Sequence, residues 1–208
     1  MILDNMTYRE IAIHLTADMQ QAIAFSRNIK FTKYRSQAIK LKRYPIFFKP
    51  IYFMSTQHNR WIVVPHAHSK KDLDYLPYYL GCIYRQHEKT FLFMRIDAYM
   101  ERPRTLNLIF TSDFFERFAE RQKLKMFEVN KEHIIIDFIK TLYRVGLKEI
   151  IEGKSSKIIM FSESGMALGY QKANQKALII FKTYVTAQDG PSELQRIHKE
   201  WMFIQEVF

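Results

Sequence analysis

The sequence predicts an α+β protein, in which helices pack on an antiparallel (mixed) sheet. Two observations predict this class: short β-branched and aromatic runs separated by turn residues fill the middle of the chain, and apolar residues at helical spacing flank them. With 208 residues, 48% of them hydrophobic, the chain can bury a large core. We expect a helical, basic N-terminal extension over residues 1–43 and an α+β domain over residues 44–208, together one compact unit.

The first predicted element is a helix that begins after Thr7. Thr7 and Glu10 have the spacing of a capping box, in which the threonine oxygen caps the first turn and the glutamate reaches back. Apolar residues follow at helical spacing from Ile11 to Ile23, which predicts one buried face. A second, shorter helix is predicted over residues 32–41.

From Tyr44 the apolar period becomes that of strands. Pro50 cannot donate a ladder hydrogen bond, so it predicts a bent or edge strand over residues 46–54. A strand from Trp61 is expected to end at Pro65, and a hairpin turn is expected over residues 86–89. The remaining strands are predicted over residues 80–85, 90–96 and 106–110, so that residues 46–110 form an antiparallel meander.

Helices return after residue 110. Residues 111–113 supply N-cap candidates for a helix from Phe114 to about Lys123, and a longer helix is predicted from about Lys131 to Ile151, closed by Gly153. Three strands are then predicted over residues 157–161, 166–171 and 177–185, followed by a final amphipathic helix from Ser192 to about Val207.

The charge of the chain is concentrated in one segment. The net charge is +11, and residues 19–71 hold eleven of the 32 Lys and Arg residues and no Asp or Glu. A block of one sign attracts polyanions. Within it, cations alternate with aromatic residues, a mixture that suits phosphate contacts and base stacking on single-stranded nucleic acid. The candidate nucleic-acid-binding residues are Lys30, Lys33, Arg35, Lys40, Lys42 and Arg43.

Two other interpretations of the basic segment stay open. The Lys and Arg stems are also suited to covering apolar surface while their charged ends stay in water. The segment also suits an acidic protein partner or inhibitor. Nucleic acid, with RNA favoured, is the partner that we expect, and the sequence leaves the oligomeric state open.

Cysteine content and hydropathy predict a cytoplasmic protein. Cys82 is the single cysteine, so no internal disulfide can form, and its apolar strand context predicts a buried, inert thiol. No secretory signal is visible at the N-terminus, and no apolar run approaches the roughly 20 residues that span a bilayer. We therefore expect no membrane partner.

No cofactor or metal is expected. His66 and His68 lie two residues apart, with His58 nearby, but this stretch offers no carboxylate before Asp72, and a zinc site needs a third or fourth ligand. Surface histidines are the preferred interpretation. No glycine-rich phosphate loop and no Gly-x-Ser-x-Gly elbow occurs.

The most patterned segment runs from Ser112 to Arg121. Glu116 and Glu120 lie one helical turn apart, as do Arg117 and Arg121, which is typical of a solvated, ion-paired helix face. Residues 108–186, under half of the chain, also resemble the RelE-like domains of the barnase–EndoU–colicin–RelE ribonuclease superfold. The matching features are an E-R-x-x-E-R helix, a longer helix closed by Gly153, the pair Gly169-Tyr170 and the strand end Phe181–Tyr184. Asp113 occupies a position where such domains often have histidine.

The resemblance implies a metal-independent, toxin-type ribonuclease with a site built from Arg, Lys and Tyr. Arg117 and Arg121 would hold the phosphate through their guanidinium groups, and Glu120 would act as base or orient an arginine. Lys182 and Tyr184 alternate with Thr183, so we expect them on one sheet face. The alternative is a non-enzymatic interaction protein, such as a phage or mobile-element factor, that uses its basic face to bind nucleic acid or an acidic protein.

Overall fold

A computed structural model describes residues 2–29, 32–41, 43–74, 76–99, 103–124, 130–143, 145–152, 155–172 and 177–207. The helices are α1 (Tyr8–Arg27), α2 (Thr32–Ile39), the 3₁₀ helix η1 (Lys70–Asp74), α3 (Ser112–Arg121), α4 (Lys131–Thr141) and α5 (Ser192–Val207). The strands are β1 (Ile46–Phe47), β2 (Ile51–Met54), β3 (Arg60–Ala67), β4 (Tyr78–Gln86), β5 (Lys89–Tyr99), β6 (Pro103–Phe110), β7 (Gly146–Glu152), β8 (Ser155–Ser162), β9 (Gly165–Lys172) and β10 (Leu178–Thr186).

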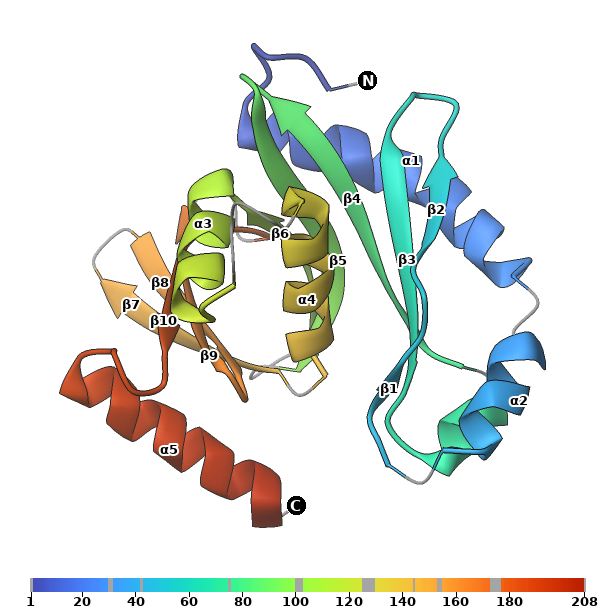
Figure 1. Ribbon diagram of the computed structural model, residues 1–208. Coiled ribbons are helices and arrows are strands. Elements are labelled where there is room, and N and C mark those ends of the chain that lie inside the picture. The colour runs from blue at the N-terminus through green and yellow to red at the C-terminus, as the bar shows by residue number, and fades with distance from the viewer. Residues whose placement is uncertain are drawn as a thin grey trace.

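One mixed sheet organises the molecule, which confirms the predicted α+β class. Its order is β1-β3-β4-β5-β6-β10-β9-β8-β7, and β2 also pairs with β3. The pairings are antiparallel except between β6 and β10, which run parallel where two antiparallel meanders meet. Helices lie on both faces of this sheet (Figure 1).

The first meander matches the sequence prediction except at Pro65. Pro50 separates β1 from β2, as expected. β3, however, continues through Pro65 to Ala67, so the prediction that Pro65 ends the strand is wrong. The Pro65 carbonyl accepts a hydrogen bond from the Phe48 amide at 2.9 Å, so this position serves as an acceptor and tolerates the missing N–H.

The predicted helix over residues 131–151 is wrong in its second half. α4 ends at Thr141, whose hydroxyl donates to the Phe138 carbonyl at 2.7 Å and so engages an oxygen at the end of the helix. Gly146–Glu152 instead forms β7, an edge strand that pairs antiparallel with β8. The β-branched Ile150 packs in the cluster beneath α5, so tertiary packing overrides the helical pattern.

α1 and α5 cover one face of the sheet, and α3 and α4 cover the other. Ile11, Leu15 and Met19 of α1 share a core with Trp61 and Ile180, so α1 contributes a layer of the main fold. Ile197 and Trp201 of α5 pack on Ile159, Phe161 and Met166, whose side chains alternate with those that face α3 and α4. Within the described residues, no helix is both long enough and apolar enough to cross a membrane.

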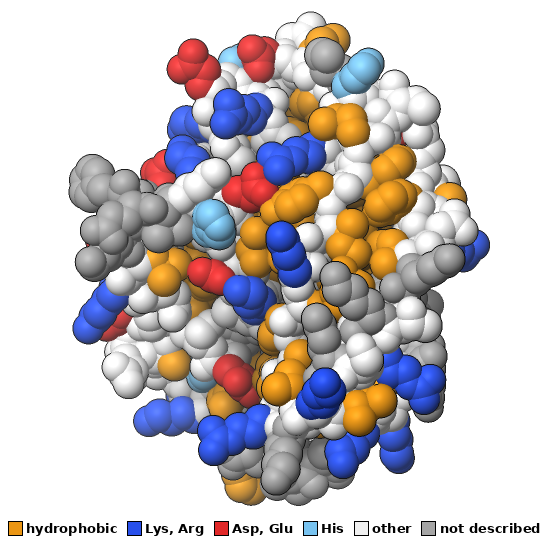
Figure 2. Space-filling view, turned by 45° about the vertical axis from the view of Figure 1, so that its right-hand side comes forward, with side chains coloured by type: hydrophobic (Ala, Val, Ile, Leu, Met, Phe, Trp, Pro, Cys, Tyr) orange, Lys and Arg blue, Asp and Glu red, His pale blue; other side chains and the backbone are white. Residues whose placement is uncertain are grey.

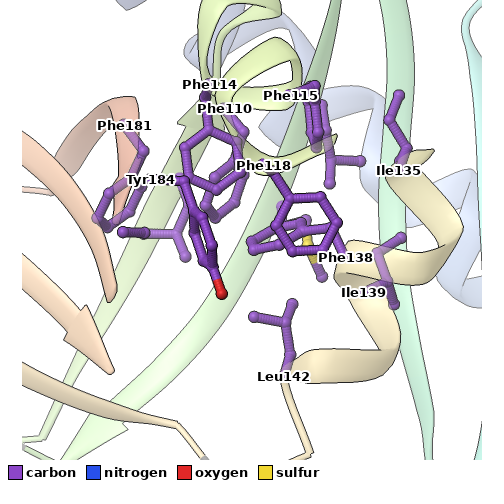
Figure 3. Packing of buried hydrophobic residues seen from close by; sticks show 14 of the residues in the cluster. Phe110, Phe114, Phe115, Phe118, Ile135, Phe138, Ile139, Leu142, Phe181 and Tyr184 are labelled. Carbon is purple, nitrogen blue, oxygen red and sulfur yellow. The ribbon is translucent and has the colours of Figure 1, made fainter. Parts of the chain in front are cut away.

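An aromatic cluster fixes α3 and α4 on β6 and β10. Figure 3 shows the rings of Phe110, Phe114, Phe118, Phe138 and Tyr184 converging between these elements. Ring centroids are 4.9 Å apart for Phe114 and Phe138, and 4.9 Å apart for Phe118 and Tyr184. Contacts at this distance are favourable beyond the apolar area that they bury, so they set the position of α3.

Candidate nucleic-acid interface

The basic segment folds around a small core of its own. α2, β1 and η1 enclose Ala38, Ile46, Phe48, Leu73 and Leu76 near the end of β3. α2 packs directly against η1, and the two lie together at the lower right of Figure 1. We call this unit, residues 32–49 and 67–76, the basic lobe.

Exposed cations surround the basic lobe. Among the side chains that the structure describes there, the exposed Lys and Arg residues are Arg35, Lys40, Arg43, Lys49, Lys70 and Lys71. Figure 2 shows Lys and Arg side chains gathered at the lower right of the molecular surface. The Asp72 carboxylate accepts hydrogen bonds from the amides of His68, at 2.6 Å, and Ser69, at 2.9 Å, so it caps the start of η1.

Three of the six predicted nucleic-acid-binding residues are therefore placed on the lobe surface. These are Arg35, Lys40 and Arg43. Lys30 and Lys42 lie outside the described residues, and Lys33 belongs to α2 but its side chain is not described. Lys70 and Lys71 join the group through the contact between η1 and α2, which sequence proximity alone did not indicate.

Two aromatic residues of the basic segment, Tyr34 and Tyr44, pack on the core of the lobe. Tyr34 packs edge-on against Phe48, with ring centroids 5.1 Å apart, and Tyr44 packs on the same small core with its hydroxyl oxygen buried. Both rings are partly buried because they pack on this core, and their availability to bases stays a prediction. The exposed cations are therefore the main feature that the lobe offers to a polyanion.

The α3 residues of the predicted catalytic set lie on the outer side of that helix. Arg117, Glu120 and Arg121 are exposed, while Phe114, Phe118 and Ala119 face the core. Arg121 forms an ion pair with Asp189 across 3.2 Å, and Glu116 lies 3.9 Å from Lys131. The expected ion-paired helix face is confirmed by these contacts.

Lys182 and Tyr184 do not share a sheet face, so that prediction is wrong. The register between β10 and β9 shifts between Phe181 and Thr183, which breaks the strict alternation. Tyr184 is only 2% exposed and its hydroxyl donates to Ser164 Oγ at 2.9 Å, while Gln122 donates to it at 3.0 Å. Lys182 is exposed on the other face, with Nζ 5.2 Å from the centre of the Tyr170 ring.

The five predicted catalytic residues are thus divided between the two faces of the sheet. α3 carries Arg117, Glu120 and Arg121 on the face to which Tyr184 also points, and the sheet separates them from Lys182. Burial raises the pKa of the Tyr184 hydroxyl, which keeps it in the protonated state that its hydrogen bond to Ser164 uses. This arrangement does not bring a base, an acid and phosphate-binding cations to one point.

His66 is a core residue and not the surface histidine that the sequence predicted. It is 4% exposed, and its ring stacks on Tyr79 with centroids 4.3 Å apart and lies 4.5 Å from that of His68. Among the described residues, no group of three His, Cys, Asp or Glu is placed to hold a metal ion. Cys82 is buried, as predicted, and burial raises the pKa of its thiol.

The environment of His66 predicts acid-dependent stability. Burial, and then the proximity of His68, lower the pKa of His66 from 6.5 to about 4. Between these pH values the unfolded chain binds a proton that the folded chain does not. The free energy of unfolding should therefore fall as the pH is lowered from 6.5 towards 4, with a slope of up to about 1.4 kcal/mol per pH unit from this group.

Urea unfolding at a series of pH values measures this slope. The His66→Phe variant should lose the part of the slope that belongs to His66, whereas His133→Gln, at an exposed site, should keep it. Equal slopes in the wild type and in His66→Phe would contradict the assignment.

No family model, curated protein or solved structure matches the chain. The resemblance of residues 108–186 to RelE-like domains therefore stays a prediction. The structure also brings together residues to which the sequence assigned no role. Tyr8, Arg9 and His87 meet Tyr170 at the N-terminal end of α1, and their separation along the chain hid this grouping.

Proposed function

We propose that this protein binds nucleic acid, with RNA favoured, through the basic lobe. The observation that carries the proposal is that residues 32–49 and 67–76 pack around one small core, on which α2 and η1 expose Lys and Arg side chains together. Clustered cations bind the phosphate backbone and release its condensed counterions, which gives affinity without base contacts.

The proposal is for binding without a cleavage step. RNA cleavage through the 2′-hydroxyl needs a base for that oxygen, an acid for the leaving oxygen and positive charge at the phosphate. The residues predicted for these roles lie on opposite faces of the sheet, and Arg121 is paired with Asp189. The lobe, in contrast, has the charge that binding needs.

The salt dependence of binding tests this function. We expect a fluorescein-labelled oligouridylate of about 12 nucleotides to bind, with affinity falling steeply between about 50 and 200 mM NaCl. The logarithm of the affinity should fall with the logarithm of the salt concentration with a slope of up to about −4, because each phosphate neutralised by one of the lobe cations contributes about 0.7 on a single strand. Fluorescence anisotropy measures both quantities.

Polyglutamate is the matched competitor, because it has regular negative charge but no phosphate or base. When the two competitors are compared at equal molar concentration of negative charges, unlabelled RNA should displace the labelled oligonucleotide at a much lower concentration than polyglutamate does. Equal displacement by both polymers would favour the acidic-protein alternative, and binding that is insensitive to salt would contradict the phosphate-based proposal.

A further inference from the structure

A pocket lies at the N-terminal end of α1, on the face of the sheet that α1 and α5 share. Its volume is about 450 Å³, and its walls include Asp4, Thr7, Tyr8, Arg9, His87 and Tyr170, with Ile180 as apolar floor. This volume is within the range of small-ligand sites. The lining combines aromatic rings with polar and charged groups from α1, the β4–β5 turn and β9.

Cross-strand pairing places the aromatic wall beside cations. Tyr170 pairs with Ile180 on one side and with Lys157 on the other, so the three side chains form a row across β10, β9 and β8. Lys157 is exposed, and Lys182 places its ammonium 5.2 Å from the centre of the Tyr170 ring. Tyr170 is thus a half-buried ring with positive charge around it.

The opposite wall is held in place by a network at the start of the chain. The side-chain amide of Gln86 donates to the backbone carbonyls of Asp4, at 3.1 Å, and Met6, at 2.6 Å. The backbone amide of His87 donates to the Asp4 carboxylate at 2.7 Å. His87 and Glu88 have φ values of 47° and 62°, a left-handed conformation that non-glycine residues adopt at a cost. These contacts hold the rim at Tyr8 and Arg9 without a ligand.

A second hollow continues along the same flank of α1. It measures about 490 Å³ and is lined by Gln20, Ile23, Tyr78, Tyr79 and Arg95, among others. Between the two hollows, Thr16 donates to the Asn107 side chain at 3.4 Å. Thr16, Gln20, Ile23 and Arg27 follow one another at three- and four-residue spacing, and Arg9 lies seven residues, about two turns, before Thr16, so they line one side of α1. Arg27 is the last residue of α1, and the basic lobe follows it in the sequence.

We propose that the pocket at Tyr8 and Tyr170 binds one unpaired nucleotide of a single strand, with the base against Tyr170 and the phosphates near Arg9, Lys157 and Lys182. This inference rests on the proposed function and assigns it a second contact point. Aromatic rings beside cations are what a single strand requires, because every base offers a π-face and every linkage a negative charge. Arg9 lines the pocket together with the carboxylate of Asp4, and Lys182 adds a positive charge beside the Tyr170 ring.

The distance between the pocket and the lobe predicts a length requirement. α1 has 20 residues and is therefore about 30 Å long, which corresponds to about nine stacked nucleotides at about 3.4 Å each. Oligouridylates shorter than this should occupy the pocket or the lobe but not both. Affinity should therefore rise with length until about nine nucleotides and then level off.

The test uses Tyr170→Ala in the full chain. Loss of the stacking ring should weaken binding of the labelled 12-nucleotide oligouridylate by about 5- to 150-fold, and should leave the affinity for a duplex of equal length close to that of the wild type, because paired bases cannot enter the pocket. Tyr170→Phe keeps the ring and should bind like the wild type. Phe203→Ala is the matched control, since it removes an aromatic ring that is 66% exposed on α5.

A second variant keeps the inference testable if Tyr170→Ala does not fold. Lys182→Ala removes an exposed side chain, and it should reduce the salt slope for the single strand by about 0.7, whereas Lys199→Ala on α5 should not. If Tyr170→Ala folds and binds the single strand as the wild type does, the pocket inference is overturned and the lobe proposal stands. If the wild type binds no oligonucleotide, the proposed function itself fails.

Discussion

Replacing Phe114 by alanine is expected to lower the free energy of unfolding by about 3 to 5 kcal/mol. Phe114 is fully buried, and its ring centroid lies 5.1 Å from that of Phe110 and 4.9 Å from that of Phe138. These partners come from β6 and α4, so the truncation leaves a cavity where three elements meet. Urea unfolding followed by circular dichroism measures the change as a shift of the midpoint at constant slope.

Phe203 provides the matched control for this truncation. It is 66% exposed on α5, so Phe203→Ala should change the free energy of unfolding by no more than about 0.5 kcal/mol. A similar loss in both variants would show that the cluster around Phe114 does not hold α3 and α4 on the sheet.

Neutralising the basic lobe is expected to have the largest effect on binding. The triple variant Lys40→Gln, Arg43→Gln and Lys70→Gln removes three exposed cations, two from the segment that follows α2 and one from η1. The salt slope for a single strand should become less steep by about 2, since each lost phosphate contact contributes about 0.7. The affinity of the triple variant at about 50 mM salt should also be lower than that of the wild type. Anisotropy titration measures both the affinity and the salt slope.

A control triple separates the position of the charges from their number. Arg85, Lys148 and Lys199 are exposed cations outside the lobe, and their replacement by glutamine removes the same formal charge. Its salt slope should stay that of the wild type. Equal weakening in the two triples would mean that net charge alone drives binding and that the lobe has no special role.

The elements that the sequence predicted correctly are those that local interactions determine. Thr7 and Glu10 form the predicted capping box, with the Glu10 carboxylate accepting from the Thr7 amide at 2.8 Å and Thr7 Oγ1 accepting from the Glu10 amide at 3.3 Å. The β4–β5 hairpin and the final helix α5 also lie where period and turn residues place them. In each case neighbours in sequence carry the signal.

Elements that depend on distant partners were not predictable in this way. Residues 146–152 have a helix-compatible pattern, and it is pairing with β8 that makes them a strand. The register shift in β10 moves Lys182 to the face opposite Tyr184, and no local feature of Phe181–Tyr184 indicates it. Alternation alone therefore misplaced one of the predicted catalytic residues.

The candidate interface was predictable in its charge but not in its geometry. The absence of acidic residues over 19–71 indicated the cations, whereas the partial burial of Tyr34 and Tyr44 follows from their packing on the small core of the lobe. The pocket at Tyr8 and Tyr170 joins positions that are far apart in the chain and meet only in the folded sheet. Single-sequence patterns do not contain that information.

Binding through the basic lobe is tested by photo-crosslinking of a thiouridine-containing single strand, followed by mass-spectrometric mapping of the attached peptides. We expect crosslinks within the basic lobe, residues 32–49 and 67–76, that disappear in the lobe triple and persist in the control triple. Crosslinks confined to the outer face of α3, where Arg117 and Arg121 lie, would contradict it.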